Sequence, residues 1–209
     1  MAETGILLST AISIAIIHTL IGFDHYIPFI ALSQANKWSM KKTMLIVLLC
    51  GIGHVLSSVL IGIIGIALSS ALSFLTDIEN IRSAIATYFL IAFGLVYTIF
   101  GIRQAVKNKS HTHIHNGNSF WGLFIFLVLG PCEPLIPVIM YPAATLNIYV
   151  LILVTLSFAI CTIAVMLLMT FLGIKGIRFL KMEKLGRYSH LMAGLAILIC
   201  GISVWLMPI

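Results

Sequence analysis

Long apolar runs separated by short polar connections make up most of the chain. Six of these runs are long enough to cross a bilayer as helices, which takes about 20 apolar residues. They lie near residues 6–33, 43–73, 83–103, 119–143, 147–174 and 188–208. The second run is long enough to tilt or to extend beyond the hydrocarbon layer. The pattern predicts an all-α, polytopic membrane protein with six transmembrane helices.

The basic residues are distributed unequally between the connections, and this predicts an orientation. Of the 12 Lys and Arg residues, 11 lie in the connections after the first, third and fifth runs, and only Arg82 lies on the other side. The positive-inside rule places the basic connections in the cytoplasm. We therefore expect an inner-membrane protein with both termini outside the cytoplasm. The net charge of +6 reflects this topology, and we expect no nucleic-acid partner.

The composition supports the same class. The chain is 61% hydrophobic and 9% charged, with a mean hydropathy of +1.15, which leaves too little polar surface for a soluble domain. The four cysteines all lie in apolar runs and form no CxxC pair, so we expect no disulfide framework. The first run follows an acidic start and lacks a clear cleavage site, so its pattern is not that of a signal peptide. The expected partner is the lipid bilayer, and assembly into a homo-oligomer is left open.

An internal repeat divides the chain into two halves. FDHYIPFIA (23–31) aligns with CEPLIPVIM (132–140), which places Asp24 opposite Glu133. Two glycines of the third run align with two of the sixth: Gly94 with Gly194 and Gly101 with Gly201. Three spans in each half give opposite orientations, a plan common in transporters, whose substrate sites lie at the repeat interface. The predicted units are a three-helix repeat over 1–103, a cytoplasmic linker over 104–118 and an inverted three-helix repeat over 119–209.

Helix breakers occur at the same place in both halves. A proline inside a helix removes a donor and displaces the carbonyl four residues earlier, so Pro28 would free the carbonyl of Asp24 and Pro137 that of Glu133. Further breakers flank the two positions: Gly22 in the first half, and Pro131 and Pro134 in the second. Irregular backbone at membrane depth is tolerated where it is surrounded by protein or lines a water-filled cavity. The breaks therefore predict a polar site, with a simple packing kink as the alternative.

Ionisable side chains inside the runs mark the candidate site. An acid at the bilayer centre costs roughly 2.5–3.5 kcal/mol on insertion scales. The intramembrane groups are the acids Asp24 and Glu133 and the histidines His18, His25 and His54. Imidazole and carboxylate together suit Ni, Co, Zn, Mn or Fe(II), and Cys132 would add a softer ligand. Proton or redox chemistry, an anion site or a purely structural role are the alternatives.

The connection between the halves contains a second group of histidines. In KNKSHTHIHNGNS the histidines alternate, a composition typical of short metal-binding tracts, and they are His111, His113 and His115. Such a loop would deliver or sense metal rather than coordinate it at a transport site. The alternative is a solvated polar linker.

Two short motifs carry resemblances to known families. HTLIGFDHY together with GIGHVLSSV resembles the nickel/cobalt transporter superfamily, which includes RcnA-like exporters and UreH-like proteins. This resemblance implies that His18, Asp24, His25 and His54 bind metal. GPCEPLIP (130–137) looks like the proline-cysteine element of the CcdA/DsbD family, which passes reducing equivalents across the membrane.

These observations lead to one main hypothesis and three alternatives. The main hypothesis is a transporter, not an enzyme, that moves a divalent transition metal (Ni, Co, Zn, Fe or Mn) through a His/Asp/Glu site at the repeat interface. The first alternative is a thiol-redox conduit with Cys132 as the working thiol. The second is a small-anion exporter of the sulfite type. The third is a membrane accessory protein that passes metal to an enzyme.

Overall fold

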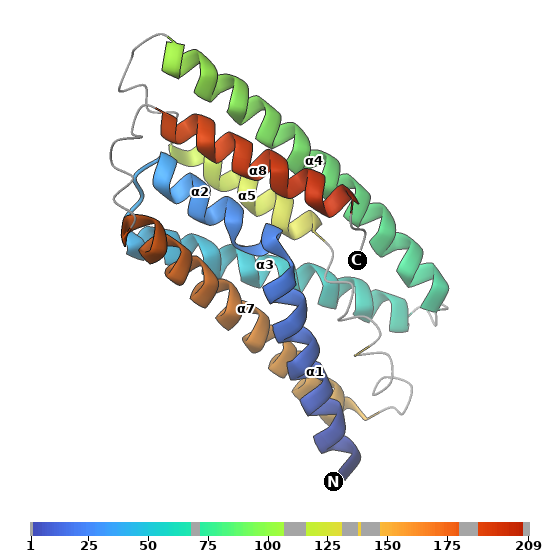
Figure 1. Ribbon diagram of the computed structural model, residues 1–209. Helices are drawn as coiled ribbons and strands as arrows, with labels where there is room; N and C mark the ends of the chain where they lie inside the picture. The colour runs from blue at the N-terminus through green and yellow to red at the C-terminus, as the bar shows by residue number, and fades with distance from the viewer. Residues whose placement is uncertain are drawn as a thin grey trace.

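A computed structural model describes residues 2–67, 72–106, 116–130, 138, 147–179 and 188–206. These residues are almost entirely helical, and no strand occurs among them. The elements, labelled in Figure 1, are α1 (Ala2–Ile21), the short 3-10 helix η1 (Phe23–His25), α2 (Ile27–Ala35), α3 (Met40–Ala67), α4 (Leu72–Val106), α5 (Asn116–Leu129), α7 (Ile148–Phe179) and α8 (Ser189–Leu206). The all-α prediction is confirmed for this part of the chain.

Within the described residues, five helices are long and apolar enough to cross a membrane. Their candidate spans are Glu3–Ile21, Met40–Ile64, Asn80–Val106, Ile148–Ile177 and Ser189–Leu206. The predicted multi-pass character is therefore supported. In the fourth predicted run, 119–143, a shorter apolar helix covers Phe120–Leu129. Most of the rest of that run lies outside the described residues, so a sixth span stays a prediction.

The first apolar run is divided, and the division places the candidate site. α1 ends at Ile21 and α2 starts at Ile27, with η1 between them. Pro28 lies in the first turn of α2, where the missing N–H of proline has no helical partner to lose. The expectation that Pro28 acts from inside a continuous helix is therefore wrong. Pro28 begins the second helix, and the break lies before it, from Gly22 to Tyr26.

Among the described helices, α4 and α8 make the most extensive contact, and they run side by side in Figure 1. A Cβ atom added to Gly94 would lie 2.6 Å from the backbone N of Leu198, and one added to Gly194 would lie 2.5 Å from the backbone N of Thr98. Two further glycines contact the opposite backbone in the same way: Gly101 at Leu191 and Gly201 at Ile91. Small residues allow this close approach of the helices. The aligned glycines thus make reciprocal contacts between two antiparallel helices.

The largest buried core surrounds α2. Phe29 and Leu32 of α2 are fully buried and belong to one cluster with Leu90 of α4, Leu127 of α5 and Ile197 of α8. α1 instead packs along α7, and α5 packs along α3. The break before α2 therefore lies where the chain passes from α1 into this core.

Candidate metal centre

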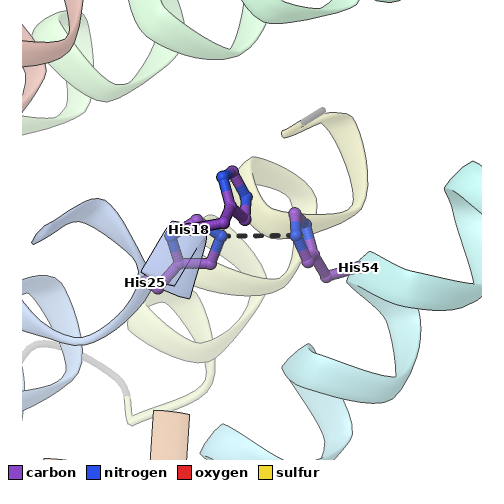
Figure 2. Close-up of side chains that lie close together, drawn as sticks. All are labelled: His18, His25 and His54. Carbon is purple, nitrogen blue, oxygen red and sulfur yellow. Dashed lines mark hydrogen bonds between the residues drawn. The ribbon is translucent and has the colours of Figure 1, made fainter. Parts of the chain in front are cut away.

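Three histidines meet at the break. His18 lies in the last turn of α1, His25 ends η1, and His54 lies in the middle of α3. Each offers one ring nitrogen, and these three atoms lie within 4.8 Å of one another. Figure 2 shows the three rings converging, with the dashed line joining His25 Nε2 to His54 Nε2 at 3.4 Å. The structure thus brings three of the predicted site residues together.

The local backbone explains how two histidines seven positions apart come together across a helix end. Gly22 N–H donates to His18 O at 2.8 Å, which closes the last turn of α1. The next two hydrogen bonds join residues three positions apart, as in a 3-10 helix: His25 N–H donates to Gly22 O, and Tyr26 N–H donates to Phe23 O. A Cβ atom at Gly22 would collide with the His25 ring. Glycine therefore allows the imidazole of His25 to fold back against the end of α1.

The hydrogen bonds of His25 and His54 indicate which ring nitrogen carries the hydrogen when each ring is neutral. His54 Nδ1 lies 2.9 Å from the carbonyl oxygen of Leu127, which can only accept. His25 Nδ1 lies 3.1 Å from the carbonyl oxygen of Gly22 and 3.3 Å from Asp24 Oδ1. In both neutral rings Nδ1 is therefore the donor and Nε2 presents a lone pair. In these tautomers the two Nε2 atoms, 3.4 Å apart, are both acceptors, and either a shared proton or a metal cation between them would satisfy both.

His18 supplies the third nitrogen. Its Nε2 is buried and has no hydrogen-bond partner. A buried polar atom without a partner costs about 1–3 kcal/mol, so such atoms are rare without a functional reason. Three converging imidazole nitrogens are a common ligand set for transition metals and leave a further position open. The cluster can therefore bind a metal ion through three neutral histidines.

Asp24 lies behind His25 and not among the converging nitrogens. Its Oδ1 is 3.3 Å from His25 Nδ1, the nitrogen that points away from His54. The sequence predicted Asp24 as a metal ligand, and this stays a prediction; the structure places the carboxylate beside His25 Nδ1. Carboxylates that accept from the second nitrogen of a metal-bound histidine fix the ring orientation and raise its basicity. Asp24 is suited to that role toward His25.

A cavity of about 610 Å³ opens onto the cluster. It lies between the end of α1, η1, the first half of α4 and the end of α8, and His18, Asp24 and His25 line it. Among the described residues that line it, Asp24 is the only charged one, and hydroxyl groups come from Ser83, Thr87, Tyr88 and Ser203. Its volume is many times the about 30 Å³ that a water molecule occupies in the liquid. The cavity can therefore admit a hydrated cation to His18 and His25.

Sequence reasoning missed the role of Arg82, which it placed in a connection on the side with few basic residues. The guanidinium donates to Ser57 Oγ at 3.0 Å, to Val128 O at 3.1 Å and to Gly130 O at 2.9 Å. Ser57 lies one turn after His54 on α3. Arg82 thus joins the turn of α3 that follows His54 to the end of α5. The signal in the sequence was an arginine at the edge of an apolar run, on a side otherwise without basic residues.

Several predicted residues lie outside the described part of the chain. They are Pro131, Cys132, Glu133, Pro134 and Pro137 of the second break, and His111, His113 and His115 of the linker. Their roles stay predictions. The contribution of the second half to the site is described only up to Gly130.

Comparison with known protein families, with curated proteins and with solved structures finds no match to this chain. The function is therefore argued from the geometry of the histidine cluster and its surroundings.

Proposed function

We propose that this chain is a membrane transporter for a divalent transition-metal ion, which binds between His18, His25 and His54. One observation carries the proposal: His25 Nε2 and His54 Nε2 face each other at 3.4 Å while both rings are held at Nδ1 by acceptors. Neutral imidazole suits Ni, Co, Zn and Fe(II), whereas Mn prefers oxygen ligands. With Asp24 placed behind His25, the all-nitrogen set favours the first four metals.

The position of the cluster supports transport rather than storage. The ends of two helices, α1 and α5, lie beside it, as shown by the bonds from His25 to Gly22 O and from His54 to Leu127 O. The carbonyl end of a helix carries partial negative charge and stabilises cations. Transporters with broken helices use such half-helix ends in their ion sites. The cavity at His18 and His25 supplies an access route from one side.

The architecture of the proposal is two inverted three-helix repeats with six spans and both termini outside the cytoplasm. The reciprocal contacts of Gly94 and Gly194 support it, because a two-fold relation between α4 and α8 would produce such pairs. In this scheme the cation enters through the cavity, where His18 and His25 replace some of its water ligands. His54 then completes the coordination. A rearrangement of the two repeats around the cluster then exposes the ion to the other side.

Uptake into proteoliposomes tests the proposal. The purified protein is reconstituted and given an external mixture of Ni, Co, Zn, Fe(II) and Mn, and the trapped metal is measured by elemental analysis. We expect selective uptake by the wild type and none by His54→Gln, with His190→Gln as the control at a histidine outside the cluster. If the folded wild-type protein traps no metal, transport is wrong. Metal binding without uptake would instead support the accessory role.

A further inference from the structure

The end of α5 is held by side chains from two other helices. The last carbonyls of a helix have no partner within it and carry partial negative charge. Here Leu127 O accepts from His54 Nδ1 of α3 at 2.9 Å, while Val128 O and Gly130 O accept from Arg82 of α4 at 3.1 and 2.9 Å. The carbonyl that orients His54 therefore lies next to the carbonyls that Arg82 binds.

Arg82 also binds the turn of α3 that follows His54. Its guanidinium donates to Ser57 Oγ at 3.0 Å and to Ser58 Oγ at 3.4 Å. Ser57 Oγ in turn donates to His54 O at 2.8 Å. Arg82 is thus connected to both sides of the hydrogen bond between His54 and Leu127: to the α3 turn that carries the donor and to the α5 end that carries the acceptor.

We propose that Arg82 is a positioning residue of the histidine cluster, which holds the end of α5 against α3 so that Leu127 O stays on His54 Nδ1. This contact keeps the hydrogen of neutral His54 on Nδ1 and leaves the Nε2 lone pair directed at His25. Without it, the ring exchanges between its two tautomers, and the form with hydrogen on Nε2 cannot bind a metal there. The consequence for metal binding rests on the proposed function, whereas the effect on the tautomer does not.

The chemistry of the side chain fits this role. A guanidinium has five N–H donors in a rigid plane, so it can bind acceptors on two helices at once in fixed directions. A lysine ammonium is a compact group on a flexible stem and lacks this planar fork. Arg82→Lys therefore keeps the charge at the end of α5 but loses part of the link to α3. We expect its effect to lie between those of the wild type and Arg82→Gln.

The first test is the tautomer of His54 in the metal-free, full-length protein. With ¹⁵N-labelled histidine in nanodiscs, long-range ¹H–¹⁵N correlation spectra distinguish the two neutral tautomers, and His54→Gln assigns the resonance. We expect only the Nδ1–H form in the wild type and in Arg103→Gln, a control at an exposed arginine on the same helix. Arg82→Gln should give a mixture of both forms. A pure Nδ1–H form in Arg82→Gln would overturn the proposal.

The second test is the affinity for the metal that the wild type binds best. Loss of a partner that orients a ligand typically weakens metal binding by about 10–100-fold, and we expect this loss in Arg82→Gln. In a His54→Gln background, Arg82→Gln should cause no further loss, because Arg82 acts through His54. Independent losses that add would indicate a general effect on folding and would contradict the proposal.

A third variant covers the case in which Arg82→Gln does not fold. The double variant Ser57→Ala/Ser58→Ala removes both hydrogen bonds from Arg82 to α3 and keeps the bonds of Arg82 to the end of α5. We expect a mixture of His54 tautomers in this variant too, and an unchanged spectrum would overturn the proposal. If the wild type binds no metal, the proposed function is wrong. The spectra of metal-free protein still test whether Arg82 fixes the tautomer of His54.

Discussion

Two regions of the molecule contain histidines packed against other rings, and they differ in what the nitrogens meet. In the cluster, His25 Nε2 faces His54 Nε2 at 3.4 Å. Toward the other end of α8, the partly buried His190 forms a hydrogen bond through Nδ1 with Tyr97 Oη at 2.9 Å, and Tyr97 Oη accepts from the amide of Asn36 at 3.2 Å. The second region pairs donors with acceptors, whereas the first leaves lone pairs converging. Convergence of lone pairs, and not burial, distinguishes the candidate metal site.

The largest expected difference between the two regions is in metal affinity. His54→Gln removes one of three nitrogens, so we expect affinity to fall by more than the about 100-fold that an orienting partner can account for. His190→Gln should leave affinity unchanged, because His190 lies outside the cluster. Competition with a chelating indicator in detergent measures both. Equal losses in the two variants would show that the distinction between the regions is wrong.

The second prediction sharpens the role of Asp24. Asp24→Asn keeps the shape of the side chain but removes the charge that orients His25 and raises its basicity. We expect metal affinity to fall by about 10–100-fold, less than for His54→Gln. The same substitution at the exposed acid Asp77 is the control and should have no effect. A loss as large as that of His54→Gln would indicate that Asp24 binds the metal directly.

The third prediction concerns pH. Metal and protons compete for the same Nε2 lone pairs, so lowering the pH protonates the histidines and weakens metal binding, and raising it restores binding. Below the pKa of each histidine that binds the metal, we expect a loss of about tenfold per pH unit for each competing proton. Affinity measured by competition at a series of pH values checks this. An affinity that stays constant even at pH values low enough to protonate the histidines would mean that histidine is not the ligand.

The smallest expected effect belongs to the other region. Tyr97→Phe removes the partner of His190 Nδ1 and one of the two acceptors of the Asn36 amide, which should reduce the free energy of unfolding by about 1–3 kcal/mol. Metal affinity should not change. Thermal melting in detergent, with Tyr88→Phe at an exposed tyrosine as the control, measures the first effect. A fall in metal affinity would show that the two regions are energetically coupled.

Much of the fold follows from local features of the sequence. Long apolar runs predict the helices, and Gly22 with Pro28 marks the break between α1 and α2. The grouping of His18, His25 and His54 was also predicted, because polar residues inside membrane helices gather away from lipid.

The remaining details of the site depend on tertiary geometry. Whether Asp24 contacts a metal or a histidine is decided by the 3-10 turn of η1, which sequence spacing does not specify. The bonds of Arg82 depend on how the ends of α4 and α5 meet α3. Both residues are charged and conspicuous in the sequence, but their partners become visible only when the helices are placed.

The one-sided cavity also has an electrical consequence. His18 and His25 line it, whereas His54 is only 2% exposed and is bonded to Leu127, a residue of the packed core. Moving a divalent ion through a potential of 100 mV involves about 4.6 kcal/mol, twice the value for one charge. A membrane potential falls mainly across the region that excludes water, which in the proposed transport scheme is the core beyond His54. A cation would reach the histidines with little electrical work and meet most of the voltage as it leaves them.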